Sequence, residues 1–313
     1  MKGIEISKEY FYKYGLPMLE KDFPDLISKL ACGIIGSGSE CLGFDDAVSA
    51  DHDFDPGFCI FIPGEDVINR RTAFLLERAY AKLPKEFSGV KRSLLSPVGG
   101  ARRGVLRTED FFAQKIGSAD GVLDISQWLS IPEQALLEAT NGTLFFDNYG
   151  EVTKIRESLK YLPEDIRLKK IAGNLLMMAQ SGQYNYMRCI EHGDTAAAQL
   201  AVYEFVEHAI STVFLLNKAY KPYYKWCFKA LRALPELSIE AEIFEYLITT
   251  DNTADLCKEK YDAIESVAAD IVDLLMKQNI TNAICGDLEK HAYSVNDAIA
   301  DAGIRNLHIM AAV

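Results

Sequence analysis

The stretch that decides the fold spans residues 31–54 and reads ACGIIGSGSECLGFDDAVSADHDF. It opens with a short apolar run, Ala31–Ile35, which predicts a buried strand. The strand runs into the turn Gly36-Ser37-Gly38-Ser39. Because glycine has no Cβ, backbone N–H groups of such a turn can approach a phosphate, and the start of a following helix adds positive potential. The segment therefore predicts a strand that ends in a phosphate-binding turn.

Two aspartates follow this turn after 13 intervening residues, 38–50. Asp51 and Asp53 are separated by one residue, so in an extended strand both side chains lie on the same face. Carboxylate oxygens placed in this way suit hard divalent cations, which in turn bridge substrate phosphates. Each signal alone is weak, because a Gly-Ser turn is often a solvated loop and an Asp-x-Asp pair is often an exposed turn. Their conjunction favours a nucleotide and metal site.

The composition of the whole chain excludes several classes of protein. Among 313 residues, 45 are acidic and 33 are basic, which gives a net charge of −12, and 49% are hydrophobic. This apolar content supports a buried core and argues against disorder. An acidic chain also argues against binding duplex DNA by counterion release, which needs many cations on one face. The composition does not exclude a localised basic pocket.

The cysteines and the apolar runs indicate a cellular setting. Seven cysteines occur without a C-x-x-C pair, so the spacing predicts neither a zinc site nor a disulfide framework. The N-terminus lacks an apolar leader, and no apolar run approaches the ~20 residues that span a bilayer. We expect a cytoplasmic protein that is not held in a membrane.

The two halves of the chain differ in their patterns. Up to about residue 145, short apolar runs alternate with glycines, prolines and helical stretches, as in a domain of mixed helices and strands. We expect a helix over Ser7–Lys29 with a break at Pro24, a helix over Glu65–Leu83 and a strand over Gly104–Thr108. The second half repeats apolar residues at intervals of three and four, which predicts amphipathic helices; the run is Val202, Phe205, Val206, Ala209, Ile210, Val213 and Phe214. The predicted domains are 1–150 and 151–313.

The turn and the aspartate pair together resemble the hG[GS]…Dh[DE]h signature of the nucleotidyltransferase superfamily, which has the DNA polymerase β-like fold. The extended form of this segment, GSGSECLGFD followed by SADHDF, is similar to the DUF4037 family. So are three further motifs at 128–134, 188–194 and 220–226, which read WLSIPEQ, RCIEHGD and YKPYYKW. The resemblance implies an α+β protein, with an N-terminal mixed-sheet nucleotidyltransferase domain and a C-terminal α-helical bundle. Members of DUF4037 generally have no assigned acceptor.

The resemblance also implies roles for particular residues. Gly36, Ser37 and Ser39 would bind the phosphates of a nucleoside triphosphate, and Asp51 and Asp53 would hold two Mg²⁺ ions. His52 replaces the usual apolar residue between the aspartates, and we interpret it as packed or bound to water. In related antibiotic nucleotidyltransferases the helical domain offers a lysine and aromatic rings to the nucleotide, which implies Lys225 and Tyr223 here. Packing between the two domains explains these aromatic rings equally well.

A third carboxylate is common in the superfamily, on the strand that here corresponds to Gly104–Thr108. That strand contains no acid, and Glu109 and Asp110 follow it directly. Either acid could complete the metal site or act as general base, or both could simply favour the start of a helix. The preceding Arg102 and Arg103 could neutralise a triphosphate or lie in a solvated loop.

These observations lead to three hypotheses. The first is an enzyme that transfers a nucleoside monophosphate from a triphosphate to a hydroxyl acceptor, which could be a small molecule, RNA or protein. The second is a nucleotide-binding regulatory or antitoxin-like module without turnover. The third is an antibiotic nucleotidyltransferase whose acidic pocket attracts aminoglycosides. The preferred nucleotide and the oligomeric state stay open.

Overall fold

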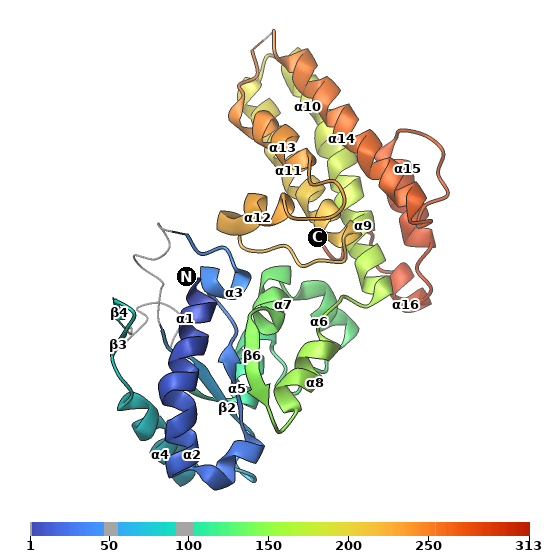
Figure 1. Cartoon of the computed structure of the whole chain (residues 1–313). Helices are drawn as coiled ribbons and strands as arrows, with labels where there is room; N and C mark the ends of the chain where they lie inside the picture. The colour runs from blue at the N-terminus through green and yellow to red at the C-terminus, as the bar shows by residue number, and fades with distance from the viewer. Residues whose placement is uncertain (1, 47–55, 92–102, 254) are drawn as a thin grey trace. The chain divides into compact units, whose positions relative to one another are not determined.

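The structure is a computed structural model that describes residues 2–46, 56–91, 103–253 and 255–313 (Figure 1). The chain forms two compact units. Unit 1 consists of Met1–Leu123 and Pro132–Lys160, and unit 2 consists of Asp124–Ile131 and Tyr161–Val313. Residues 124–131 are thus separated from unit 1, into whose sequence they are inserted. None of the described helices is long and apolar enough to cross a membrane.

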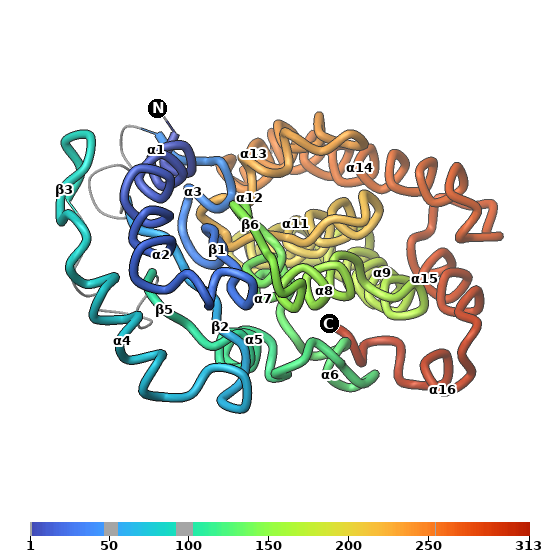
Figure 2. Tube along the Cα trace, turned by 60° about the horizontal axis from the view of Figure 1, so that its bottom comes forward, coloured from blue at the N-terminus to red at the C-terminus, as the bar shows by residue number. Residues whose placement is uncertain are grey.

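Unit 1 contains a mixed four-stranded sheet with the order β5-β2-β1-β6 (Figures 1 and 2). Its strands are β1 (Ala31–Ile34), β2 (Cys59–Ile62), β5 (Gly104–Arg107) and β6 (Thr143–Asp147). β1 is antiparallel to both β2 and β6, whereas β2 is parallel to β5. A separate hairpin joins β3 (Glu86–Phe87) to β4 (Val90–Lys91). The α+β fold with a mixed sheet is therefore confirmed.

The helices of unit 1 pack on both faces of this sheet. They are α1 (Gly3–Tyr10), α2 (Leu16–Asp22), α3 (Ser39–Leu42), α4 (Arg70–Ala81), α5 (Thr108–Ile116), α7 (Glu133–Thr140) and α8 (Glu151–Ser158). Cys32, Ile60 and Ile62 point toward α1, α2 and α4, with which they form one hydrophobic core. The intervening Phe61 packs edge to face on Phe111 of α5, at 5.2 Å between ring centroids. This division follows from the alternation of side chains along a strand.

Residues 7–29 are mostly helical, as the sequence predicts, but they are not one regular helix. A π-helical stretch, Phe11–Gly15, lies between α1 and α2, and a 3₁₀ turn, Pro24–Lys29, follows α2. The break at Pro24 is confirmed. The helix predicted over Glu65–Leu83 is shorter and begins at Arg70, where the side chain of Asn69 accepts a hydrogen bond from the Thr72 N–H.

Unit 2 is helical throughout its regular structure. Its helices are α6 (Ile125–Ser130), α9 (Glu164–Met178), α10 (Tyr186–Glu191), α11 (Thr195–Leu216), α12 (Tyr224–Leu231), α13 (Glu240–Thr249), α14 (Cys257–Lys277), α15 (Leu288–Asp297) and α16 (Ala302–Arg305). A π-helical stretch, Ala179–Asn185, joins α9 to α10. α11 contacts α9, α10, α13 and α14. All seven apolar residues from which the sequence predicts an amphipathic helix are buried in α11.

Candidate functional site

The predicted Gly-Ser turn follows β1 directly. Gly36 and Gly38 have φ values of +106° and +127°, which L side chains rarely adopt, so glycine is required at both positions. Asn141 fixes the turn. The Gly36 N–H donates to Asn141 Oδ1 at 2.9 Å, and Asn141 Nδ2 donates to the Gly36 carbonyl at 2.9 Å. The predicted phosphate-binding residue Ser39 begins α3 and is buried.

Ser37 lies in a polar network with side chains from two helices. Lys115 of α5 donates to Ser37 Oγ at 2.9 Å and to the carboxylate of Glu138 in α7. Ser37 Oγ donates to Glu138 Oε2 at 2.7 Å. The lysine and glutamate side chains are each about one-fifth exposed. The turn therefore carries a cation at its serine, and that cation is balanced by one carboxylate.

The charge state of Glu138 follows from these contacts. Burial raises the pKa of this carboxyl, but hydrogen bonds from Lys115 and Ser37 outweigh burial, so its pKa lies below the ordinary value of 4.5. Glu138 is therefore ionised at neutral pH and holds Lys115 beside the turn.

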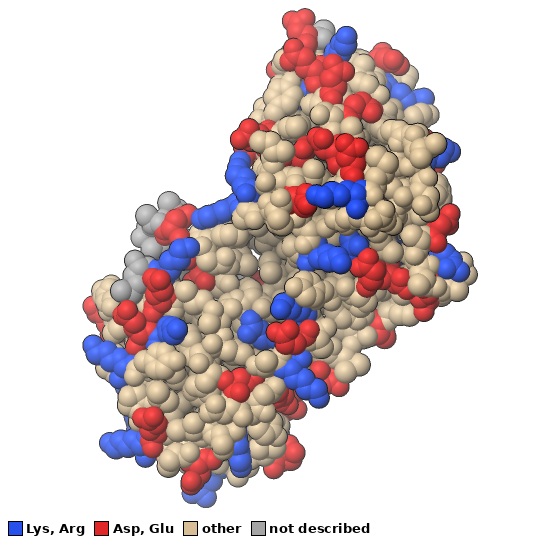
Figure 3. All heavy atoms as spheres, turned by 45° about the vertical axis from the view of Figure 1, so that its right-hand side comes forward, with Lys and Arg blue, Asp and Glu red and all other residues tan. Residues whose placement is uncertain are grey.

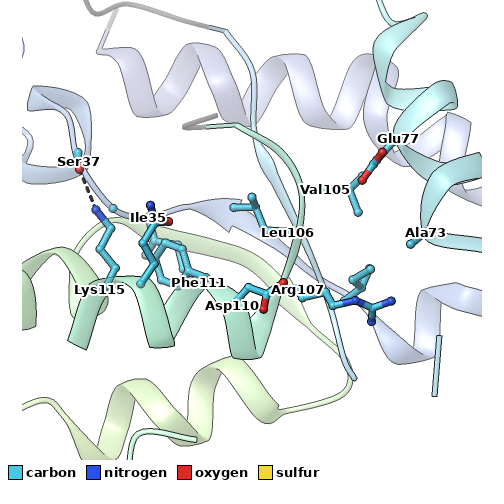
Figure 4. A pocket seen from close by; sticks show the side chains of 13 residues that line it. Ile35, Ser37, Ala73, Glu77, Val105, Leu106, Arg107, Asp110, Phe111 and Lys115 are labelled. Carbon is cyan, nitrogen blue, oxygen red and sulfur yellow. Dashed lines mark hydrogen bonds between the residues drawn. The ribbon is translucent and has the colours of Figure 1, made fainter. Parts of the chain in front are cut away.

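A cavity of about 340 Å³ opens beside this network (Figure 4). Gly36, Ser37 and Lys115 line one part of it, and Glu77, Arg107 and Asp110 are among the residues lining the rest. In Figure 4 the Lys115 side chain from α5 points toward Ser37, and Glu77 lies across the cavity on α4. The Arg107 guanidinium is tied to backbone carbonyls, donating to Pro63 at 2.8 Å and Ile68 at 3.0 Å. Lys115 is thus the cation of this cavity that lies at the turn.

Glu109 and Asp110 both lie in the first turn of α5, where negative charge is favoured by the helix dipole. Both are exposed. Asp110 lines the cavity, whereas Glu109 Oε2 lies toward Gly64. Since β5 pairs with β2 in parallel and Arg107 lies opposite Ile62, the two acids follow the ends of these strands, away from Cys59 at the start of β2. Their predicted catalytic role stays a prediction.

The predicted metal ligands Asp51 and Asp53 lie outside the described residues, as do His52 and Arg102. The structure informs on Asp51 and Asp53 only through the register of the strand that follows them, β2. Gly33 of β1 lies opposite Cys59 of β2, so the start of β2 is beside the end of β1 and its turn. In the sequence Asp53 precedes Cys59 by six residues. Among the residues that the structure describes, no group of three or more metal-ligating side chains is present.

Arg103 does not lie in a solvated loop. Its guanidinium is buried and forms an ion pair with Glu40 of α3, which is also buried. Burial by itself lowers the pKa of Arg103, but Cys41, Cys59 and Glu40 around the guanidinium outweigh burial and raise it. This charged pair connects the start of β5 to α3, the helix that follows the Gly-Ser turn, so it helps to hold the end of the turn in place.

The predicted nucleotide contacts Tyr223 and Lys225 belong to unit 2, at the start of α12. Tyr223 precedes the helix and is 44% exposed, and its ring centroid is 4.1 Å from that of Tyr224. Lys225 is exposed, with its Nζ 5.1 Å from the centroid of the Trp226 ring. These residues form a surface of their own, whose role in nucleotide binding stays a prediction.

The sequence alone does not identify Lys115, Glu138 or Asn141 as residues of this site. The dipeptide Asn141-Gly142 is a turn signal that marks the start of β6, and it indicates where the asparagine lies in the chain. No local signal indicates that it pairs with Gly36. Lys115 and Glu138 look like ordinary polar residues of amphipathic helices, and only the packing of α5 and α7 brings them to Ser37.

Comparison with known proteins gives a family match and similarity to a solved structure. Residues 128–227 match the family described as "Domain of unknown function (DUF4037)". The solved structure of a nucleotidyltransferase-like protein from Exiguobacterium sibiricum 255-15 aligns with 91% of this chain and 81% of its own, at 11% identity and a TM-score of 0.38. No curated protein matches. Over residues 128–227 the chain is thus similar to the DUF4037 family, which confirms the resemblance drawn from its sequence motifs.

Proposed function

We propose that the protein is a Mg²⁺-dependent nucleotidyltransferase that moves a nucleoside monophosphate from a nucleoside triphosphate to a hydroxyl acceptor and releases pyrophosphate. The observation that carries this proposal is the cavity in which the Gly36-Ser37 turn meets Lys115. A glycine turn after a buried strand, with a lysine ammonium at its serine, has the donors that a polyphosphate needs.

The phosphates are assigned to the end of the cavity where Ser37 and Lys115 lie. An ammonium has three donor hydrogens, and here two of them are directed to Ser37 Oγ and to Glu138. A bound phosphate would compete with Glu138 for Lys115. Glu138 therefore serves to hold Lys115 in place before the nucleotide binds.

The metal site is assigned to Asp51 and Asp53, whose carboxylate oxygens are the ligand type that Mg²⁺ prefers. Bound there, Mg²⁺ would lower the pKa of the attacking hydroxyl and offset the charge of the leaving pyrophosphate. Asp110 lines the cavity but follows the far end of β5, so it is assigned neither to the metal nor to the hydroxyl that the metal activates.

The double variant Asp51→Asn with Asp53→Asn tests this mechanism. We expect Mg²⁺-dependent pyrophosphate release to fall at least about a hundredfold, because metal ions supply several kcal/mol of charge stabilisation to such reactions. The matched control is Asp22→Asn with Asp25→Asn, which removes two exposed acids of the same unit and should leave the rate unchanged. Activity of the Asp51/Asp53 variant equal to that of the control would exclude the mechanism.

One observation favours a second candidate, a nucleotide-binding regulatory module without turnover. β5, the neighbour of β2 in the sheet, carries no carboxylate in any of its four residues. A site with two carboxylates holds metal less strongly than one with three. Calorimetry with the four common triphosphates in Mg²⁺, followed by a pyrophosphate-release assay with small molecules, RNA and proteins as acceptors, separates the two candidates. Tight binding with no release for any acceptor would favour the module.

A further inference from the structure

Residues 217–235 of unit 2 differ in charge from the rest of the chain. This segment of 19 residues contains five cations and no acid, in a chain with a net charge of −12; the cations are Lys218, Lys221, Lys225, Lys229 and Arg232. Acidic and basic side chains are interspersed over the face drawn in Figure 3. The segment is therefore basic along the sequence, although in space Lys221 forms an ion pair with Glu207 of α11.

α12 displays three of these cations on one side. Lys225, Lys229 and Arg232 are spaced by four and three residues, which places them on one face of a helix, and all three are exposed. The Nζ atoms of both lysines lie near the Trp226 ring, at 5.1 and 5.7 Å from its centroid. Arg232 forms an ion pair with Glu245 of α13. Lys225 has no acidic partner within the described residues.

The start of α12 adds to this positive potential. No side chain caps the helix at Tyr223, and its first turn contains no acid. Lys225 lies in that first turn, at the positive end of the helix dipole, where a cation is unfavourable. A bound anion would remove this repulsion.

Two large aromatic rings lie exposed beside these cations. Tyr223 is 44% exposed and Tyr224 is 77% exposed, and their ring centroids are 4.1 Å apart. Neighbouring cations and exposed rings are the combination on which single-stranded nucleic acids bind, with phosphates on the cations and bases stacked on the rings. A single nucleotide would use one ring and one cluster of phosphates. Two adjacent rings, with cations spread over two helical turns, fit successive nucleotides.

We propose that the α12 surface, defined by Tyr223, Tyr224, Lys225, Trp226 and Lys229, binds a single-stranded nucleic acid, and that this strand is the acceptor of the transferred nucleotide. The acceptor role rests on the proposed function, whereas the binding does not. In the reaction, a terminal hydroxyl oxygen of the strand bonds to the α-phosphorus of the triphosphate. The bond from that phosphorus to the leaving pyrophosphate breaks, and the hydroxyl proton passes to a base and then to solvent. A duplex fits poorly, because its stacked bases cannot reach the tyrosines.

The binding is tested on the full chain, without triphosphate, by fluorescence anisotropy with labelled 12-nucleotide RNA and DNA strands and with the corresponding duplexes. For Lys225→Ala we expect the slope of log K against log salt to decrease by about 0.7, the contribution of one phosphate contact with a single strand. Lys258→Ala is the matched control, because it removes an exposed lysine of unit 2 outside this surface. Its slope should equal that of the wild type.

The tyrosines are tested by a pair of substitutions at Tyr224. Tyr224→Ala should weaken single-strand binding on the order of five- to a hundredfold, since stacking on an aromatic ring contributes about 1–3 kcal/mol per base. Tyr224→Phe keeps the ring and should bind as the wild type does. Thermal unfolding of each variant verifies that it is folded.

Three results would overturn the proposal. They are a salt slope for Lys225→Ala equal to that of the control, duplexes that bind as tightly as single strands, and ATP that displaces a strand at equal concentration. The acceptor role has its own readout, the extension of the labelled strand by one nucleotide with Mg²⁺ and each triphosphate. Strands that bind but are not extended, together with pyrophosphate release to another acceptor, would refute the acceptor role and leave the proposed function standing. Absence of release to every acceptor would refute the proposed function and leave the binding standing.

Discussion

At the scale of the residue, the candidate site combines a local pattern with distant contacts. The Gly36-Ser37 turn is predictable because glycines that follow an apolar strand have a conformational reason visible in the sequence. The partners of the turn are not predictable in this way. Lys115, Glu138 and Asn141 are separated from it by 78, 101 and 105 residues. Their positions depend on how α5, α7 and β6 pack, and no local rule encodes that packing.

Arg103 is a second residue whose position depends on a distant partner. In the sequence it follows Gly99-Gly100 and Arg102, which is typical of a solvated loop. The structure buries its side chain against Glu40, 63 residues away. A buried cation needs an acidic partner, and the partner of Arg103 is distant in the sequence. The sequence near Arg103 therefore does not predict that its side chain is buried.

The ion pair between Lys115 and Glu138 should make stability depend on pH. Since the pKa of Glu138 is lowered on folding, its contribution is fully present above the ordinary value of 4.5 and is lost as pH falls through the lower folded value. We expect Glu138→Gln to lower the free energy of unfolding by about 1–2 kcal/mol near pH 7, and by clearly less near pH 3. Urea denaturation at the two pH values measures the difference. A loss of the same size at both would contradict the assignment.

At the scale of the element, both π-helical stretches share one construction. Phe11–Gly15 and Ala179–Asn185 each contain a glycine on which an aromatic ring from another element packs. A Cβ on Gly15 would lie 2.4 Å from Phe58, and a Cβ on Gly182 would lie 2.4 Å from Phe205. The sequence correctly predicts a helix over the first region, within Ser7–Lys29, and amphipathic helices in the second half as a whole. It does not predict the π-helical turns, because the rings that occupy these spaces come from distant parts of the chain.

The packing at Gly182 leads to a prediction for unit 2. Gly182→Ala would bring a methyl group 2.4 Å from Phe205 of α11 and 2.9 Å from Ile264 of α14. We expect a loss of about 1–3 kcal/mol in the free energy of unfolding, the usual cost of overpacking. The sign of the change in the free energy of unfolding is informative, because replacing glycine by alanine at an open helical position raises this free energy. Gly286→Ala, where a Cβ meets nothing within 4 Å, is the control, and denaturant titration of both variants decides the matter.

The strands were predicted unevenly. β1 and β5 match their predicted ranges to within a residue, because each is a short apolar run next to a glycine. β6 was not predicted, although its Leu144, Phe145 and Phe146 are apolar and β-favouring. It lies close to the predicted domain boundary at 150/151, and the neighbouring Asn148-Tyr149-Gly150 looked like the beginning of a linker.

At the scale of the whole molecule, the chain passes between the two units three times, after residues 123, 131 and 160. The sequence predicts two successive domains, because composition changes only once along the chain. Short insertions such as 124–131 leave no trace in composition. α6 contacts α9, and Lys170 Nζ donates to the Leu129 carbonyl at 3.3 Å.

This connectivity predicts how fragments behave. A fragment of residues 161–313 lacks α6 and removes one carbonyl partner from the buried Lys170. A second fragment, in which 124–131 are joined to 161–313 by a Gly/Ser linker as long as the missing segment, restores both. We expect the second to be more stable by on the order of 1 kcal/mol, since the first lacks the hydrogen bond from Lys170 to Leu129 and the contact of α6 with α9. Equal midpoints in urea would show that α6 contributes nothing to unit 2.

The position of β6 in the sheet also determines when unit 1 can complete its sheet during synthesis. β6 pairs with β1, so the sheet of unit 1 lacks a strand on the ribosome until residue 147 has emerged. By then α6 has already been synthesised, and it must wait for α9 before its own unit can form. The growing chain therefore holds two unfinished units at once, and an open edge of β1 is exposed throughout the synthesis of about a hundred residues between these strands.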